Sequence, residues 1–331
     1  MRGNKLKGTI PTTLGKMSNL RFLGLGENLL TGSLHPQTLS RLKSLEKIWL
    51  SNNKLTGSLP RSLFKRLPKL TTIDFSNNNF TGPIPDGYST DCPNLTTIYL
   101  ELNQLTGRLP ENVGGLKSLQ VFDIGHNRLS GTIPTSWMTL PNLTDFNLAG
   151  NGFVGTIPTE IVNLSNLSVL ILSANQFTGT FPHAQDTEDT SNDGGWSNLA
   201  KLSVVMLNDN QLSGTIPASF VEASASTLVN LDLGNNKFTG SLPSNLGKMS
   251  NLKRFHAQQN QLTGTFPMSM SRMSPILDLN LTANFLQGNV PRIFCGSGVM
   301  TRSLLFRQFG CDAVLCPPGT FHPSGAATLE S

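Results

Sequence analysis

Five histidines, four cysteines and one pair of aspartates are the side chains in this 331-residue chain that could support catalysis or metal binding. No two histidines, and no histidine with a cysteine pair, have the spacing of zinc ligands. Phosphate-binding glycine loops, G-x-S-x-G nucleophile turns and kinase signatures are also absent from the sequence. Asp123 and Asp145 stand in neighbouring copies of a sequence repeat and could form a carboxylate pair that catalyses hydrolysis. Acidic residues in such positions more often belong to a solvated binding face. We therefore expect a protein that is not an enzyme and uses no metal or cofactor.

Asparagines recur with a spacing that points to structure rather than to catalysis. They occupy the N position of the pattern L-x-x-L-x-L-x-x-N-x-L-x-G-x-I-P, which repeats every 24 or 25 residues after a partial first coil, except for intervals of 35 residues between Asn175 and Asn210 and 26 between Asn210 and Asn236. An asparagine amide can bond to backbone groups that a turn leaves without partners, so stacked turns would form a ladder. The predicted ladder contains Asn28, Asn53, Asn78, Asn103, Asn127, Asn151, Asn175, Asn210, Asn236, Asn260 and Asn284.

The strand that precedes each asparagine predicts the binding face. Ile48 and Leu50 alternate with Trp49, which indicates a short strand with one buried side. Outward residues of successive strands should form columns on the concave face of a parallel sheet. Exposed aromatics beside charges, and apolar blocks, suit contacts with a partner, although such residues are also common in strands. The candidate ligand-binding residues are Phe22, Lys47, Trp49, Asp74, Tyr99 and Asp123, and a separate apolar block of Val169, Ile171, Val204 and Met206.

The segment Leu129-Ser130-Gly131-Thr132-Ile133-Pro134 resembles the plant-type leucine-rich repeat. This repeat is found in the ectodomains of receptor-like kinases and receptor-like proteins, and in secreted polygalacturonase inhibitors. The resemblance covers roughly residues 4–291. It implies an α/β solenoid, a right-handed superhelix of about 12 coils with a parallel concave sheet and a second small sheet formed by the L-x-G-x segments. Since one coil cannot bury its leucines alone, neighbouring coils must close the core.

Three regions depart from the repeat, one within the predicted array of residues 1–291 and two beyond it. Residues 183–198 form a polar, acidic insertion, which predicts a surface loop; receptors of this repeat type can use such an insertion in the ligand site. Residues 292–316 predict a cysteine-containing cap, with a disulfide between Cys295 and Cys311, although sequence alone does not fix connectivity. Residues 317–331 resemble the start of a small cysteine-rich module of the EGF or ephrin-receptor type.

Charge is distributed unevenly along the chain. Residues 1–70 contain 13 Lys or Arg and two acidic residues, whereas residues 71–200 contain three basic and twelve acidic residues. This predicts a dipolar surface, and because stacking aromatics do not alternate with the basic residues, nucleic acid is not an expected partner. No apolar stretch is long enough to span a membrane, and no signal-peptide pattern opens the chain. We read the chain as part of a longer protein, and disulfides and N-x-S/T sites favour the cell surface or the extracellular space.

The resemblance implies an extracellular recognition module of a receptor-like protein. Its ligand would be a peptide, a protein or a cell-wall polysaccharide bound on the concave face, with a co-receptor as a further partner. Two alternatives remain open at the level of sequence. One is a secreted inhibitor of a cell-wall hydrolase. The other is an ice- or mineral-surface binder, because a row made mostly of threonines precedes the repeat glycines, from Thr31 to Thr263.

Overall fold

A computed structural model describes residues 1–60, 67–86, 92–182, 195–273, 276 and 278–288. The predicted cap with Cys295 and Cys311, the segment 317–331 and most of the predicted insertion lie outside the described residues. The chain divides into two compact units, an N-terminal unit, Met1–Val154, and a C-terminal unit, Gly155–Ser331. Each unit is described separately.

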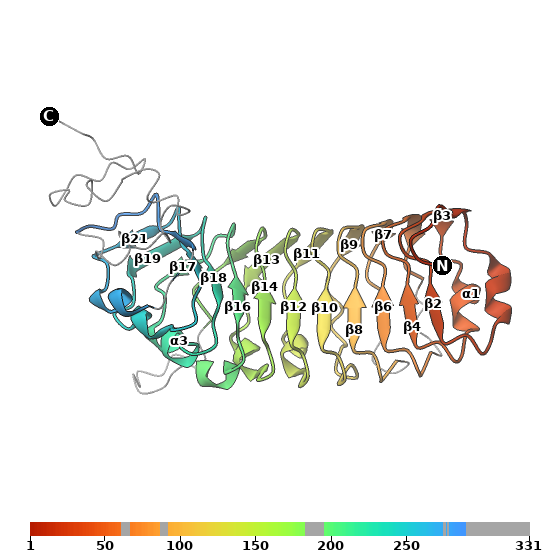
Figure 1. Cartoon of the computed structure of the whole chain (residues 1–331), viewed down its shortest axis with the longest axis horizontal. Coiled ribbons are helices and arrows are strands. Elements are labelled where there is room, and N and C mark those ends of the chain that lie inside the picture. Colours follow the sequence, from red (N-terminus) through yellow and green to blue (C-terminus); the bar gives the residue numbers. More distant parts are fainter. Residues whose placement is uncertain (61–66, 87–91, 183–194, 274–275, 277, 289–331) are drawn as a thin grey trace, which may run out of the picture. The chain divides into compact units, whose positions relative to one another are not determined.

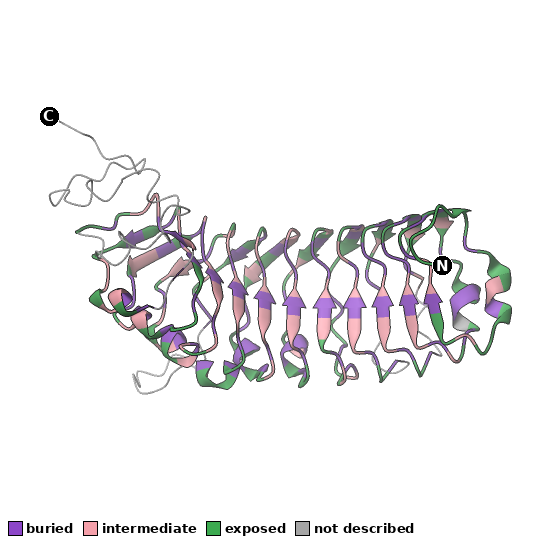
Figure 2. Cartoon of the chain, in the orientation of Figure 1, coloured by how far each residue is buried: buried purple, intermediate pink, exposed green. Residues whose placement is uncertain are grey.

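The outward-facing sheet of the N-terminal unit consists of three-residue parallel strands in chain order (Figure 1). The middle residue of each strand is buried and most of the flanking residues are half-buried, which is the period-two pattern that the sequence predicts (Figure 2). The strands are β2 (Phe22–Gly24), β4 (Lys47–Trp49), β6 (Thr72–Asp74), β8 (Thr97–Tyr99), β10 (Val121–Asp123) and β12 (Asp145–Asn147). The predicted solenoid of parallel strands is confirmed.

A second parallel sheet of this unit follows the ladder asparagines. Each strand contains the repeat glycine, which adopts a positive φ; that of Gly57 is 81°, and a Cβ there would lie 2.9 Å from Ser33 Cβ. Only glycine fits this close approach without strain. The strands are β1 (Lys7–Gly8), β3 (Leu29–Ser33), β5 (Lys54–Ser58), β7 (Asn79–Gly82), β9 (Gln104–Gly107), β11 (Arg128–Gly131) and β13 (Gly152–Thr156).

The segment that connects the second sheet of one coil to the outward strand of the next forms short helices, because the repeat proline limits helix length. In the N-terminal unit they are η1 (Thr12–Lys16), α1 (Pro36–Ser40) and η2 (Thr135–Thr139). Trp137 of η2 is 1% exposed and packs against Phe122 and Phe146, with ring centroids 4.4 and 5.6 Å apart. Its indole Nε1 donates to the Pro110 carbonyl at 2.9 Å, so the buried polar atom is satisfied.

The C-terminal unit repeats this arrangement. Its outward-facing strands are β14 (Val169–Ile171), β16 (Val204–Met206), β18 (Asn230–Asp232), β20 (Arg254–His256) and β22 (Asp278–Asn280). The second sheet contains β17 (Ser213–Gly214), β19 (Lys237–Ser241) and β21 (Gln261–Thr263), while β15 (Gln176–Thr178) precedes a single bridge from Thr180 to Ser213. The helices are η3 (Thr159–Asn163), η4 (Trp196–Leu199), α3 (Ala218–Ala223), η5 (Leu246–Lys248) and η6 (Met268–Arg272). No described helix is long and apolar enough to cross a membrane.

The end of the predicted insertion differs from the expected surface loop. Gly195 has a left-handed conformation and begins η4, in which Trp196 is only 2% exposed. The Trp196 ring packs against Phe181 and Phe220, with centroids 5.3 and 4.9 Å apart. Because burial of the large indole outweighs the polarity of its neighbours, residues 196–198 belong to a coil and not to the insertion.

The asparagines connect each coil to the one before. Asn53 donates from Nδ2 to the carbonyls of Leu50 and of Leu25 in the preceding coil, both at 3.0 Å, and its Oδ1 accepts from the Leu30 amide at 3.0 Å. The residue before most of these asparagines has a positive φ, between 49° and 56°. The strained turn therefore persists because the amide satisfies the backbone groups around it. Hydrogen bonds of this type are made by Asn28, Asn53, Asn78, Asn103, Asn127, Asn151, Asn210, Asn236, Asn260 and Asn284, and Asn175 donates to two carbonyls of its own coil.

Candidate ligand-binding surface

The strand register of the N-terminal unit brings the predicted binding residues together. Trp49 pairs with Asp74, Asp74 with Tyr99, and Tyr99 with Asp123, so these four residues form one row across β4, β6, β8 and β10. Phe22 pairs with Lys47 in the adjacent row. The outward side chains from β2 to β10 therefore form a continuous surface.

At the β2–β4 end lies a group that we call the aromatic cluster: Arg21, Phe22, Glu46, Lys47 and Trp49. The Phe22 and Trp49 rings are stacked, with centroids 6.5 Å apart and an angle of 10° between their planes. Lys47 Nζ lies 5.6 Å from the Trp49 ring, and the Arg21 guanidinium carbon lies 5.3 Å from the Phe22 ring. These distances allow cation–π attraction, and Phe22 is 47% exposed.

The two cations of the aromatic cluster are not equivalent. Arg21 Nε and Nη2 donate to the two carboxylate oxygens of Glu46 at 2.7 and 3.0 Å. These hydrogen bonds raise the pKa of Arg21 and lower the pKa of Glu46. In contrast, Lys47 forms no ion pair with any described residue. Lys47 is therefore the cation that remains available to a ligand, and the partners Arg21 and Glu46 lie one position outside the predicted set.

Further along the same surface, Asp74, Glu101, Asp123 and Asp145 surround Tyr99, and we call these five residues the carboxylate cluster. Asp74 accepts hydrogen bonds from the hydroxyls of Ser51 and Ser76 at 2.6 and 2.7 Å. Because both Asp74 oxygens already have partners, Trp49 and Tyr99 do not enclose a free carboxylate between them. Trp49 stacks on Phe22, so two of the candidate ligand-binding aromatics, Trp49 and Tyr99, belong to different clusters.

Burial dominates the electrostatics of the carboxylate cluster. It raises the pKa of Glu101 to about 7, and the nearby charges of Asp123 and Asp74 add to this effect, whereas hydrogen bonds to its own backbone and to Ser76 oppose it. Glu101 Oε2 is buried without a hydrogen-bond partner. Burial also raises the pKa of Asp123, although its oxygens accept from the Gly125 amide and the Asn147 side chain, both at 2.9 Å.

Tyr99 remains a hydrogen-bond donor at the centre of this cluster. Burial first, and then the negative charges of Asp145, Glu101, Asp123 and Asp74, raise the pKa of its phenol. No group of three or more His, Cys, Asp or Glu in the described part of the chain is arranged to hold a metal ion. The negative charge gathered around the Tyr99 phenol would attract an organic cation.

Glu101 is the functional candidate that the predicted columns missed. It follows Tyr99 by two residues, in a third outward column that also contains Ser51 and Ser76. The predicted columns contained the residue between the two buried strand positions and the residue two before it, but not the residue two after it. Extending the period-two alternation by one step past Leu100 would have revealed it.

The C-terminal unit places the predicted apolar block on its own outward face. Val169 pairs with Val204 and Ile171 with Met206, so the four half-buried side chains form a square. Nearby strands are polar. His256 Nδ1 lies 3.4 Å from Asp232 Oδ2 and its Nε2 lies 3.0 Å from Asp278 Oδ2, and these contacts raise the pKa of His256.

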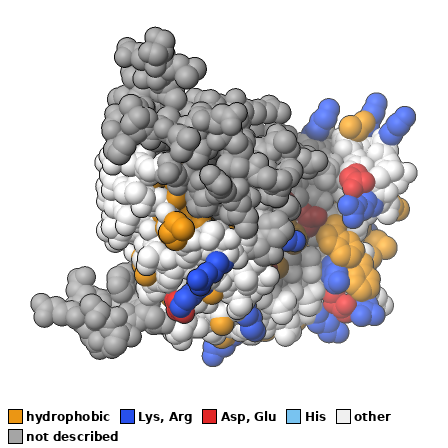
Figure 3. All heavy atoms as spheres, turned by 60° about the vertical axis from the view of Figure 1, so that its left-hand side comes forward, with side chains coloured by type: hydrophobic (Ala, Val, Ile, Leu, Met, Phe, Trp, Pro, Cys, Tyr) orange, Lys and Arg blue, Asp and Glu red, His pale blue; other side chains and the backbone are white. Residues whose placement is uncertain are grey.

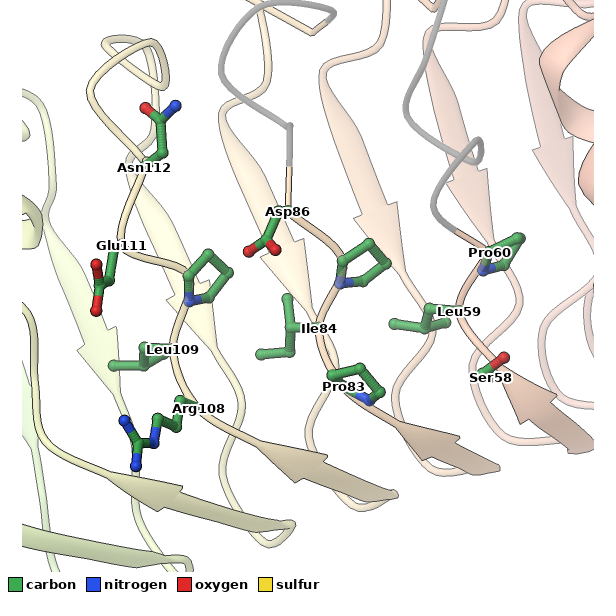
Figure 4. A pocket seen from close by; sticks show the side chains of 12 residues that line it. Ser58, Leu59, Pro60, Pro83, Ile84, Asp86, Arg108, Leu109, Glu111 and Asn112 are labelled. Atoms are coloured by element: carbon green, nitrogen blue, oxygen red, sulfur yellow. The ribbon is translucent and has the colours of Figure 1, made fainter.

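A groove also follows the ends of β5, β7 and β9 (Figure 4). Its floor consists of Leu59, Ile84 and Leu109, each 3% exposed, with the repeat prolines beside them. Asp86 lies in the upper middle of the view and the Arg108 guanidinium at the lower left, so their charges do not converge on one point. On the coloured part of the surface in Figure 3, charged and hydrophobic side chains are scattered among others that are neither.

Comparison with known proteins identifies the repeat. Family models described as leucine-rich repeats match residues 43–87, 93–153 and 227–249. The chain resembles the plant peptide hormone receptor RGFR1 in complex with RGF2, with a TM-score of 0.78 and 28% identity over 89% of this chain and 49% of that one. It also resembles the ectodomain of the receptor kinase GASSHO1/SCHENGEN3 from Arabidopsis thaliana in complex with Casparian strip integrity factor 2, with a TM-score of 0.74 and 32% identity over 92% of this chain and 37% of that one.

A third similar structure is a plant ice-binding protein, with a TM-score of 0.62 and 26% identity over 87% of this chain and 80% of that one. The chain thus spans about half or less of the length of the two receptor structures. A search of curated proteins found no match.

Proposed function

The chain is a leucine-rich-repeat protein similar to plant receptor ectodomains, and from this premise we propose that it is an extracellular recognition module that binds a peptide on the outward strands of its N-terminal unit. A co-receptor would complete such a module; the similar receptor kinase HAESA forms a complex with the peptide hormone IDA and the co-receptor SERK1.

One observation carries this proposal. The outward row of the N-terminal unit holds stacked aromatic rings and several carboxylates that the coil does not need for its core. The core residue of each strand is its buried middle residue, such as Ile48, Ile73 or Ile98. Aromatic side chains beside charges at the centre of a surface are typical of binding hot spots. The two similar receptors are complexes with RGF2 and with Casparian strip integrity factor 2, which supports a ligand of the same class here.

The test is a binding selection against the whole chain. The secreted chain would be immobilised and challenged with a phage-displayed library of random peptides, and selected peptides would be synthesised and titrated by calorimetry. The variant Trp49→Ala with Tyr99→Ala should lose about 2 kcal/mol of binding free energy, roughly thirtyfold in affinity, if these are hot spots. Thr132→Ala, an exposed residue outside the outward row, is the matched control.

The fold should survive the double substitution, because neither ring lies in the core. Thermal unfolding within a few degrees of the parent would establish this. Selected peptides that bind the double variant as tightly as the parent would place the site elsewhere, with the apolar block of the C-terminal unit as the next choice. A selection that yields no specific peptide would overturn the proposed ligand class.

A second candidate function, ice binding, is favoured by a separate surface. Exposed hydroxyl residues follow the second sheet at about 4.8 Å per strand, namely Thr31, Thr56, Thr81, Thr106 and Ser130. A regular hydroxyl row can match a crystalline lattice, and the similar ice-binding protein is matched over most of its length. Thermal hysteresis of the parent, abolished in Thr81→Lys but kept in Trp49→Ala, would support this function. An absence of both hysteresis and ice-recrystallisation inhibition would remove it.

A further inference from the structure

The outward surface of the N-terminal unit is electrically polarised. At the aromatic cluster the positive charge of Arg21 is matched by Glu46, which leaves Lys47 as the available charge. At the carboxylate cluster no ion pair engages Asp74, Glu101, Asp123 or Asp145 among the described residues. Burial raises the pKa of Asp123, and a charge on His126 opposes this effect. One end of the surface thus offers a cation and the other offers uncompensated carboxylates.

We propose that this surface selects an extended dipolar peptide segment, with an acidic side chain against Lys47 and a basic side chain against the carboxylate cluster. This inference rests on the proposed peptide-binding function and adds the charge pattern of the ligand.

The aromatic cluster favours an acidic ligand group because its own cations already occupy the rings. Lys47 lies over Trp49 and Arg21 lies near Phe22. A second cation at these rings would be repelled, whereas a carboxylate would meet the Lys47 ammonium at the edge of an apolar surface. Contacts of this kind define orientation more than they add affinity.

The carboxylate cluster is held in position before a ligand arrives. The hydroxyls of Ser51 and Ser76 fix Asp74, and the Gly125 amide and the Asn147 side chain fix Asp123. Glu101 Oε2 has no hydrogen-bond partner. Because burial raises the pKa of both Glu101 and Asp123, their negative charges lack stabilisation in the unbound chain. A ligand ammonium or guanidinium would supply it.

The strand register sets the spacing between the two charges of the ligand. From Lys47 on β4 to β10 there are three strand steps, which amount to about 14 Å at 4.8 Å per step, and Asp123 lies two residues further along its strand than the partner row of Lys47, about 6.6 Å. The two residues are therefore about 16 Å apart, and an extended peptide advances about 3.3 Å per residue. The acidic and basic residues of the ligand should therefore be about five positions apart. Either chain direction satisfies this requirement, provided that each charge meets its cluster.

The experiment uses three synthetic peptides with one apolar frame, taken from a peptide selected against the whole chain. They differ only at two positions about five residues apart, which are Glu and Arg, Glu and Glu, or Arg and Arg. With the parent chain, the Glu–Arg peptide should bind about threefold to tenfold more tightly than either other peptide at low salt. Raising the ionic strength should reduce this difference.

Charge reversal of the protein separates recognition from folding. Lys47→Glu should shift the preference to the Arg–Arg peptide, whereas Lys47→Met, which keeps the aliphatic stem on Trp49, should remove only the preference for the acidic residue. Lys54→Glu, an exposed lysine of the same coil on β5, is the matched control and should leave the preference as in the parent. Asp123→Asn retains the side-chain shape and should weaken the Glu–Arg and Arg–Arg peptides.

The outcomes distinguish this inference from the proposed function. Suppose that the three peptides bind the parent equally but all lose affinity for the Trp49 and Tyr99 double variant. This result would overturn the proposed charge pattern of the ligand and support the proposed peptide-binding function. A preference unchanged by Lys47→Glu would have the same meaning. If no peptide is selected at all, the proposed function itself fails.

Discussion

Replacing Glu101 by glutamine offers the sharpest physical test of the carboxylate cluster. In the folded chain the pKa of Glu101 is about 7, against an ordinary value of 4.5, and burial is the main cause. A carboxyl group whose pKa is raised by folding favours the folded state when protonated. Its contribution is complete below about pH 4.5 and is lost as the pH rises through about 7. Glu101→Gln should therefore stabilise the chain at pH 8, relative to the parent, and have no comparable effect at pH 4.

The size of the effect follows from the same shift. Each pKa unit corresponds to about 1.36 kcal/mol, so moving from 4.5 to about 7 sets a ceiling of about 3 kcal/mol. Glu101 is only half-buried, and water screens a partly exposed carboxylate. We therefore expect a gain of about 1 kcal/mol at pH 8.

Urea unfolding of the whole chain at the two pH values measures this gain as a shift of the midpoint. Glu111→Gln, an exposed carboxylate in the same unit, is the matched control and should change the midpoint little at either pH. An equal change in the Glu101 variant at pH 4 and pH 8 would refute the reasoning, because a pH-independent effect cannot come from ionisation. A loss of stability at pH 8 would show that the charged form makes a favourable contact in the folded chain.

Three further predictions concern the scaffold, each followed by urea unfolding of the whole chain. Asn127→Ala should cost about 1–3 kcal/mol, because the carbonyls of Leu100 and Ile124 lose a donor; an unchanged midpoint would contradict the ladder. Gly57→Ala should cost about 1–2 kcal/mol through its positive φ and the contact with Ser33, whereas Gly114→Ala, with nothing within 4 Å of an added Cβ, should be nearly neutral. His256→Gln should destabilise the chain below pH 6.5 and not at pH 9. Contacts with Asp232 raise the pKa of His256, and their contribution to stability is lost as the pH rises through this raised pKa. A loss of stability of equal size at both pH values would argue against this explanation.

The repeat pattern predicts the strands well because strand alternation and turn chemistry are local. Ile48 and Leu50 mark the inward side of a coil with no knowledge of its neighbours, and both are fully buried. The turn asparagine is equally local, because two of its carbonyl partners lie two and three residues before it.

The chemistry of the surface depends on neighbouring coils and is harder to predict. The sequence shows Trp49 and Tyr99 as outward aromatics, but their partners are residues about 25 positions away. The Phe22 ring stacks on Trp49 of the neighbouring strand. The Ser51 hydroxyl donates a hydrogen bond to Asp74, which lies on the next strand. Trp196 shows the same limit in the core, because its polar surroundings in the sequence conceal a packing site between Phe181 and Phe220.

The hydrogen bonds of the asparagines have a consequence for how such a chain can change in length. The Asn53 side chain bonds within its own coil and to the coil before it. Duplicating or deleting one whole repeat would therefore leave the bonding pattern of every other coil intact. In the N-terminal unit, a duplicated repeat between β4 and β8 would increase the distance between Lys47 and Glu101 by one strand step, about 4.8 Å, and a deleted repeat would decrease it by the same amount. Ligand length could thus be retuned in discrete increments by a single duplication, with no redesign of either cluster.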